Sequence, residues 1–543
     1  MQSEAAGLGG RTGGEADASD GGFYVQDVDF RSGVVGVQSP MSMALTAAVG
    51  GVVPPDPSAA FTYCDLGCGD GTTVNAFAEL YPHATFVGID FNPGHIRTAQ
   101  ETAAACGLDN VRFVQARFSD LANLDDLPVF DFIGMNGIYA WLEEDEAQAA
   151  RRFVGDHLRA GGLFYVEYTC LPGKVSVQPL WKLIQTLTPP RPGEDSRERA
   201  RRGLDLTEAL AKRGMAYLAA HRPAANGAQG YIRGRKVDEY RVDHFAHNAM
   251  ASGFRPRYVT DMFAEMASVG LTYAARSELA LNDLELSVPA AQVPTFQDYR
   301  DDVGTVELLK DYIRNEQQRH DVFVKDGAPD RAAADAWLDA VPRLMLRMPA
   351  DGVTRHIQAP GNARIPLRGP AYDALITAVD AKAQTVADVA AASGQPVERV
   401  RRAAVRLLAS HQMVACRTGA IEPVPEPGTV AGLTIPGRMN RRTLRLAAER
   451  LLGNQLVSPV TGTASIPVSP LEAVLLQAVV DVGVADAPPA ARDRLASETR
   501  PLPGPGGQKP ARDITADDLN EVLGAMRGRK LYNMLRLGIV APA

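Results

Sequence analysis

The sequence has few cysteines, no long apolar run and no excess of positive charge. Its cysteines are Cys64, Cys68, Cys106, Cys170 and Cys416, an odd and scattered set that is typical of reduced thiols in the cytoplasm. Cys64 and Cys68 have the spacing of metal ligands, but no second pair follows, so we expect no metal. Because no stretch of about 18 apolar residues occurs, we also expect no membrane-spanning helix.

The charge balance is acidic. The 56 basic and 64 acidic residues give a formal net charge of −8, which argues against a grip on nucleic acid over the whole surface. Residues 1–22 have no cationic start and no apolar core, so we expect a flexible tail there and not a signal peptide. The length of 543 residues exceeds that of one ordinary core and predicts several domains.

Short apolar strands alternate with amphipathic helices in the first third of the chain. The predicted strands are 61–66, 85–90, 111–115, 130–135 and 162–168, and the predicted helices are 41–53, 74–81, 93–106 and 144–158. Repeated strand, helix and strand units form a parallel sheet with helices on both faces. We therefore predict a doubly wound, Rossmann-like α/β fold.

The strongest chemical signal is the segment YCDLGCGDGTT at 63–73. A strand ends at Asp65, and Gly67, Gly69 and Gly71 let the backbone turn tightly and approach a ligand. The next strand, FVGID, ends in Asp90, where an acid binds ribose hydroxyls. A dinucleotide site shares that second acid, but the first one, Asp65, suits the ammonium group of a bound amino acid. We therefore predict S-adenosylmethionine as the cofactor.

Two later strand ends supply candidates for the rest of the site. After the third strand, the backbone at Arg117 and the ring of Phe118 are predicted to bracket the adenine, although Phe118 is equally suited to the core. The fourth strand ends in Asn136 and Gly137, at the sheet edge where open α/β folds bind their ligands.

The acceptor side is predicted from four residues that follow the fourth strand or end the fifth. Tyr139 and Trp141 would line the acceptor channel, or Trp141 would pack on the next helix. Glu167 would act as a base or bind a cationic acceptor, or serve as a surface partner. Tyr168 would help to desolvate a lysine amine. Strand alternation places Glu167 and Tyr168 on opposite faces.

The rest of the chain divides by composition. After the tail at 1–22 and a segment at 23–60, we predict a catalytic domain at 61–290 with an insertion at about 174–256, a helical linker and regulatory segment at 291–363, a winged-helix-like module at 364–425 and a helical domain at 426–543. The C-terminal half is thus expected to be mostly helical. We expect the insertion to lie over the carboxyl edge of the sheet.

Several segments together resemble a bacterial family of class I methyltransferases that carry a methyltransferase regulatory domain and include rickettsial protein-lysine methyltransferases. They are DLGCGDG, FVGIDFNPGHI, FDFIGMNGIYAWL, GGLFYVEYTCLPG and HNAMASGFRPRYVTDMFAEMASVGLTY. The resemblance implies that residues 23–60 cover the cofactor. It also implies cofactor contacts at Asp65, Gly67, Gly69, Asp90, Phe91, Phe118 and Asn136.

The acceptor is where the sequence departs from this family. Asn136-Gly137 stands where the family has His-Gly, and Glu167-Tyr168-Thr169 where it has Ser-Tyr-Asn. We expect methyl transfer to a nitrogen of a protein or peptide, with lysine favoured, and an acceptor recognised by the C-terminal half docked on the carboxyl edge. A small-molecule or peptide N- or O-methyltransferase stays open. So does a cofactor-sensing regulator that binds DNA through the arginine-rich run RVRRAAVRLL or binds protein.

Overall fold

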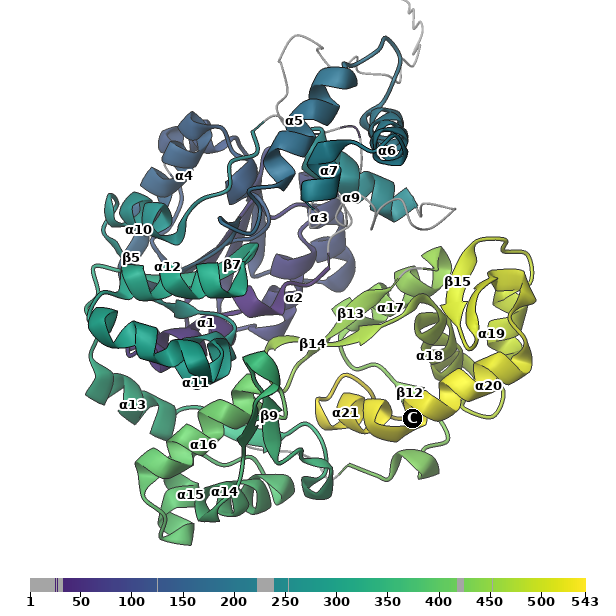
Figure 1. The fold of residues 1–543 in the computed structure, drawn as a ribbon. Helices are drawn as coiled ribbons and strands as arrows, with labels where there is room; N and C mark the ends of the chain where they lie inside the picture. The colour runs from purple at the N-terminus through teal and green to yellow at the C-terminus, as the bar shows by residue number, and fades with distance from the viewer. Residues whose placement is uncertain are drawn as a thin grey trace, which may run out of the picture. The chain divides into compact units, whose positions relative to one another are not determined.

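A computed structural model describes residues 25, 27, 33–124, 126–221, 239–251, 253–417, 424–451 and 453–543. In these residues the largest sheet has seven strands (Figure 1). In spatial order they are β3 (Val111–Gln115), β2 (Thr85–Asp90), β1 (Thr62–Leu66), β4 (Phe130–Met135), β5 (Leu158–Thr169), β7 (Gln318–Lys325) and β6 (Leu271–Arg276). The Rossmann-like prediction is confirmed for this sheet.

The helices of this part cover both faces of the sheet. They are α1 (Pro40–Val49), α2 (Thr72–Leu80), α3 (Pro93–Cys106), α4 (Glu144–His157), α10 (Val259–Ala267) and α12 (Val303–Arg314). Tyr63 of β1 and Phe77 of α2 belong to the core on one face, here called the α2 face. Cys64 of β1 and Met262 of α10 belong to the core on the opposite face, the α10 face. Neighbouring residues of each strand thus serve different cores.

One strand departs from the predicted parallel sheet. Residues 291–363 were expected to be helical, but Gln318–Lys325 form β7, which pairs antiparallel with both β5 and β6. The sheet therefore extends beyond residue 290. This strand was not predicted because its first residues are polar. Arg319 and Asp321 interrupt the apolar pattern, although both are fully buried.

Buried charges anchor β7 on the α10 face. The Arg319 side chain is 0% exposed and donates to Asp321 at 2.9 Å, to Asp311 of α12 at 2.7 Å and to Glu307 of α12 at 2.8 Å. The Tyr168 hydroxyl of β5 donates to the same Asp321 carboxylate at 2.7 Å. These five residues are called the Arg319 network. Its hydrogen bonds compensate the cost of burying the charges and join β5, β7 and α12.

The predicted insertion is a compact helical unit in its own right. The described residues of Leu180–Phe254 cluster together with Val25 and Asp27, separately from the other described residues. The helices of this region are α5 (Val177–Leu187), α6 (Ser196–Lys212), α7 (Ala216–Ala220) and α9 (Glu239–Ala249). Ile184, Leu204 and Phe245 lie in its core. The expectation that it covers the carboxyl edge stays a prediction.

The C-terminal half is rich in helices, as predicted. The first module contains β8 (Arg343–Leu346), α14 (Pro370–Ala381), α15 (Val386–Ser393), α16 (Val397–Ala409) and β11 (Met413–Cys416). Three helices are thus followed by a strand, β11, which pairs antiparallel with β8. The domain bounds stay predictions.

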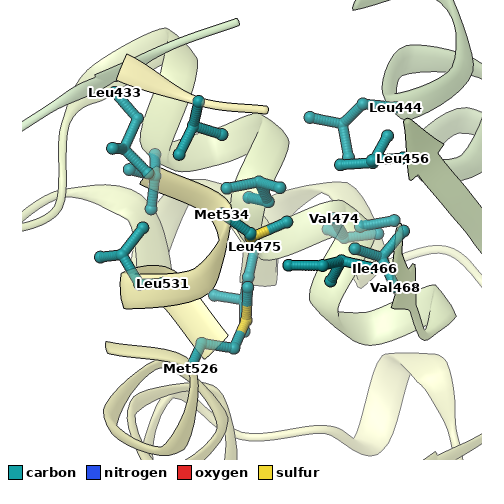
Figure 2. Close-up of a cluster of buried hydrophobic side chains, with 14 of the residues drawn as sticks. Leu433, Leu444, Leu456, Ile466, Val468, Val474, Leu475, Met526, Leu531 and Met534 are labelled. Atoms are coloured by element: carbon teal, nitrogen blue, oxygen red, sulfur yellow. The ribbon is translucent and has the colours of Figure 1, made fainter. Parts of the chain in front are cut away.

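The last part has its own apolar core. Its main elements are α17 (Arg438–Arg450), β13 (Asn454–Ser458), β14 (Thr463–Val468), α18 (Pro470–Val482), α19 (Ala487–Leu495), α20 (Ala516–Ala525) and α21 (Leu531–Arg536). Leu444, Leu475 and Met534 meet in this core (Figure 2). Within this predicted helical domain, β15 (Pro501–Gly504) and β16 (Gly507–Pro510) form a hairpin.

This last part contacts the ends of α2 and α3. The Glu79 carboxylate of α2 accepts hydrogen bonds from the backbone N–H groups of Arg438 and Met439 at 2.7 and 3.1 Å. Tyr81 donates to the carbonyl of Gly462 at 3.0 Å, and Arg417 lies 4.3 Å above the Tyr81 ring. Because α2 leads into the amino end of β2, these contacts lie toward the amino edge of the sheet. This differs from the expected docking on the carboxyl edge.

The Arg319 network yields a stability prediction. Replacing Arg319 with Ala leaves the buried Asp311 and Asp321 without their cation, so we expect a loss of about 3–5 kcal/mol in the free energy of unfolding. Urea unfolding measures this loss in the free energy of unfolding, and hydrogen exchange of the backbone amides measures the stability of β7 itself. The control is Arg445→Ala, since Arg445 is exposed and should change stability by less than about 0.5 kcal/mol. Equal losses in the two variants would contradict the anchoring role.

Candidate functional site

The glycine turn between β1 and α2 has the backbone shape that the sequence predicts. Gly67, Gly69 and Gly71 have φ angles of 76°, 55° and 73°, which L side chains rarely adopt. A Cβ atom at Gly67 would lie 2.3 Å from Ile138, and one at Gly71 would lie 2.5 Å from Ala99. At Gly69 nothing lies within 4 Å of that position. Packing therefore requires Gly67 and Gly71, whereas Gly69 leaves open space for a ligand.

Asp90 at the end of β2 holds the turn in place. Its carboxylate accepts from the backbone N–H of Gly69 at 3.0 Å and from that of Asn92 at 2.9 Å, and His95 Nδ1 lies 3.3 Å away. Asn92 in turn caps α3, which begins with Pro93. The two strand ends named by the sequence, Asp90 and the glycine turn, are thus in direct contact.

Asp65 lies in a buried setting that fits an ammonium group. Its carboxylate is 3% exposed and lies 3.5 Å from the amide nitrogen of Gln38. Burial, reinforced by the charge of Asp90, raises the pKa of Asp65 to about 7. The Oε1 atom of Gln38 is also buried and has no hydrogen-bond partner among the described residues. A cationic amine of the predicted cofactor would supply the charge and the donor that these two groups lack.

The N-terminal segment contributes this glutamine. Val35 donates its backbone N–H to Thr73 of α2 at 3.1 Å, and Tyr63 donates to the carbonyl of Gln38 at 3.2 Å. Gly134 of β4 permits this packing, because a Cβ atom there would lie 2.5 Å from the Tyr63 hydroxyl. Residues 35–38 of the predicted covering segment thus lie against β1 and α2. Tyr24, also named for this role, lies outside the described residues.

The residues predicted to hold the adenine follow β2 and β3. The Arg117 guanidinium lies 6.0 Å from the centre of the Phe91 ring. Phe118 is 9% exposed and belongs to the core of the α10 face, which agrees with the core alternative for its ring. A role for these three residues in adenine binding stays a prediction.

The acceptor-side residues lie on both faces of the sheet. On the α2 face, Asn136 accepts a hydrogen bond from the Tyr165 hydroxyl at 2.9 Å. Glu167 is 6% exposed and accepts from Gln318 of β7. Its Oε2 atom lies 3.5 Å from the place that a Cβ would take at Gly137. Glu167 therefore reaches the end of β4 beside Asn136.

Two residues predicted for the acceptor side, Tyr139 and Tyr168, have hydroxyl groups that lie in buried hydrogen-bond networks. Tyr168 points to the α10 face, where it belongs to the Arg319 network. Tyr139 is 1% exposed and bonds to Arg151 at 2.8 Å and to Glu265 of α10. Both hydroxyls thus complete buried polar networks, and the predicted roles of Tyr139 and Tyr168 at the acceptor stay predictions. Trp141 is 9% exposed, and its place at the acceptor stays a prediction.

The neighbours of Glu167 were not predicted from the sequence. Gln318 and His320 lie on the α2 face of β7, and His320 is the register partner of Glu167. Glu278, just beyond β6, bonds to His320. The alternation of Gln318, His320, Val322 and Val324 would have revealed the strand, but nothing local could place it beside β5.

The arginine-rich helix α16 does not present a free basic surface. Arg401 pairs with Asp339 at 2.8 Å, and Arg406 pairs with Asp283 at 2.9 Å. Arg402 lies 3.6 Å from Glu285. Intramolecular acids thus pair with these three arginines of the run on which the DNA-binding alternative depended.

The comparisons agree with the site. Residues 57–187 match a family model described as a methyltransferase domain, and residues 242–325 match one described as a predicted methyltransferase regulatory domain. The second range includes β6 and β7, so it completes the sheet and supplies His320. No helix in the described residues has the length and apolar character needed to span a membrane.

Relatives match parts of the chain. An uncharacterized protein from Synechocystis is 31% identical over 56% of this chain and 58% of its own length. A trans-aconitate 2-methyltransferase from Deinococcus radiodurans is 32% identical over 19% of this chain and 36% of its own length. The solved structure of PKMT2 from Rickettsia typhi in complex with AdoHcy has a TM-score of 0.66 at 16% identity, covering 94% of this chain and 100% of that one. The likeness to PKMT2 shows the shared fold.

The raised pKa of Asp65 predicts how cofactor affinity depends on pH. A carboxyl group with a pKa of about 7 is mostly protonated at pH 6 and ionised at pH 8, and only the ionised form attracts an ammonium group. Because the α-amino group of the cofactor has a pKa of about 7.8 and is itself partly neutral at pH 8, the dissociation constant of S-adenosylmethionine should be roughly fourfold larger at pH 6 than at pH 8. Calorimetric titration measures it.

The control for this experiment separates Asp65 from other titrating groups. Asp65→Asn should bind weakly and lose the pH dependence, whereas Asp109→Ala, at an exposed position near the amino edge, should keep it. An affinity of the unmodified protein that does not change between pH 6 and pH 8 would rule out the ammonium role of Asp65.

Proposed function

We propose that this chain, whose residues 57–187 form an S-adenosylmethionine-dependent methyltransferase domain, methylates a nitrogen of a protein or peptide acceptor, with lysine favoured. The predicted enzyme class and cofactor are confirmed by the domain match. The observation that carries the acceptor proposal is the buried Glu167 carboxylate beside Asn136 and Gly137, with a second carboxylate at Glu278. Carboxylates beside the expected place of the acceptor favour an amine that carries a positive charge.

A small-molecule O-methyltransferase is the second candidate. The relatives named trans-aconitate 2-methyltransferase support it, but they match about a fifth of the chain. Trans-aconitate is a tricarboxylate, and the carboxylates of Glu167 and Glu278 would repel it. The long C-terminal half also favours a macromolecular acceptor, in line with the resemblance to rickettsial protein-lysine methyltransferases.

The chain's residues divide the work of binding and alignment. Bound S-adenosylmethionine supplies a methyl group on a sulfonium, which is already a good leaving group. Asp65 and Gln38 would hold its ammonium group, Gly69 lets the backbone approach it, and Asp90 would bind the ribose hydroxyls. Glu167 would hold the acceptor amine next to Asn136. Alignment of the two reactants in a site with little water is then the main contribution of the protein.

Other parts of the proposal concern where the protein acts and what its C-terminal half does. All of its cysteines are buried and unpaired, which supports action in a reducing compartment such as the cytoplasm. We propose that the C-terminal half recognises the acceptor. Since its last part holds α2 through Glu79, it would also steady the glycine turn at the other end of that helix.

Calorimetry combined with a methyl-transfer assay tests the function. The protein should bind S-adenosylmethionine and S-adenosylhomocysteine with micromolar affinity and transfer labelled methyl groups to lysine-containing proteins. Asp90→Ala removes a charged acceptor of two ribose hydroxyls, so binding should weaken by about 3 kcal/mol, or roughly 100-fold. Asp109→Ala is the matched control and should bind normally.

The binding assay and the methyl-transfer assay together distinguish two ways in which the proposal could be wrong. Binding without transfer to nitrogen, but with transfer to carboxylates of small acids, would favour the second candidate. Absence of binding to either cofactor form would contradict the proposed function as a whole.

A further inference from the structure

β7 places a histidine, His320, beside the end of β5, where the acceptor is expected. His320 is the register partner of Glu167 across the β5–β7 pair, and both side chains lie on the α2 face. The ring of His320 lies nearly parallel to that of Tyr165, with an angle of 19° and 6.3 Å between ring centres. Tyr165 in turn donates to Asn136 at the end of β4. Contacts thus connect His320 to the strand end where the acceptor is expected.

The two ring nitrogens of His320 have different surroundings. Nδ1 lies 2.5 Å from the Glu278 carboxylate, whereas Nε2 has no hydrogen bond to a described residue. The side chain is 26% exposed, which leaves part of the ring open to a second molecule. A carboxylate at Nδ1 fixes the tautomer with the proton on Nδ1 and leaves the lone pair on Nε2. This is the arrangement of a histidine base oriented by an acid.

The charges around the ring hold it in a basic state. Burial alone would lower the pKa of His320, but the hydrogen bond and charge of Glu278 and the charge of Glu167 raise it above its usual value. Arg276 of β6 acts against this rise while it binds the other Glu278 oxygen at 3.3 Å. The pKa of Glu278 is lowered to about 2, since its bond to His320 and the charge of Arg276 outweigh its burial. The helix α1, which packs on β7, carries no charged residue.

We propose that His320 is the catalytic base that removes a proton from a protonated amine acceptor, with Glu278 as its positioning residue and Glu167 as the binding site of that amine. The proposal rests on the proposed function, and it restricts the acceptor to an amine that is cationic at neutral pH. Carboxylic acids are already ionised at neutral pH and need no such base.

The proposed step balances. The ammonium form of the acceptor gives one proton to Nε2 of His320 and becomes a neutral amine. The nitrogen lone pair then forms the new N–C bond to the methyl carbon, and the C–S bond breaks with its electron pair moving to sulfur. The positive charge moves from sulfur to the methylated nitrogen. His320 then releases its proton to water.

A base is needed because of the ordinary pKa of a lysine, about 10.4. At pH 7 only about one amine in 2,500 is neutral, which corresponds to about 4.6 kcal/mol. A positioned base contributes about 100-fold or more to such proton transfers. A purely structural His320–Glu278 pair would only hold β7 to the segment after β6.

Two variants separate these roles. His320→Asn keeps a hydrogen-bonding group toward Glu278 but removes Nε2, and Glu278→Gln keeps a hydrogen bond but removes the charge. The assay uses tritium-labelled S-adenosylmethionine with poly-L-lysine across a range of pH. His320→Asn should lower kcat about 100-fold with cofactor affinity within about twofold of normal. The control is His83→Asn, since His83 bonds only to the carbonyl of Pro57 among the described residues and should retain full activity.

The pH profile and NMR give readouts that a structural role would not change. The rate should rise with pH as His320 loses its proton, and in Glu278→Gln this rise should move to lower pH by about one unit. In His320→Asn the rate should follow the ionisation of the amine itself. NMR of the protein labelled with 15N-histidine, with His320 assigned through His320→Asn, should show the Nδ1–H tautomer and the same fall in pKa.

The possible failures are distinct. A kcat of His320→Asn within threefold of normal, or a His320 pKa that Glu278→Gln does not lower, would overturn the base role while the methyltransferase function stands. If the unmodified protein binds cofactor but does not methylate poly-L-lysine, this result would contradict both the proposed lysine acceptor and the base role of His320.

Discussion

The antiparallel insertion of β7 between β5 and β6 is the constraint on which the acceptor side depends. The Arg319 network fixes this strand by burying one cation among the carboxylates of Asp311, Asp321 and Glu307. Because side chains alternate along a strand, anchoring Arg319 on the α10 face places Gln318 and His320 on the α2 face. A shift of register by one residue would exchange the two sets. The buried charges thus determine which residues stand beside Glu167.

The cofactor side could be predicted because its signals are local. A strand end, three glycines and a following helix lie within a dozen residues, and the positive φ angles of Gly67, Gly69 and Gly71 explain why those positions are glycine. Asp90 was placed by its spacing from Gly69, and the two are in fact hydrogen-bonded. Five strands and four helices of this region were predicted close to their observed bounds for the same reason.

The acceptor side could be predicted only in part, because it is assembled from distant segments. Tyr139 and Tyr168 were chosen for their nearness in sequence to strand ends, but alternation and long-range partners direct their hydroxyls into buried networks. Gln38, Glu278 and His320 gave no local signal. Arg319 and Asp321 made β7 look like a polar helix, and the further carboxylates that neutralise Arg319, Glu307 and Asp311, lie on the distant helix α12. Because these buried ion pairs join residues far apart in the sequence, neither β7 nor His320 was predicted.

The most direct test of the account is a crystal structure of the protein with S-adenosylhomocysteine bound. A base that acts on the attacking nitrogen must lie within hydrogen-bond reach of it, and that nitrogen approaches the methyl carbon to about 3–3.5 Å. The account therefore predicts that the sulfur lies within about 8 Å of His320 Nε2, with Glu167 lining the space between them. A sulfur directed toward the α10 face, with Glu167 and His320 out of reach, would contradict it.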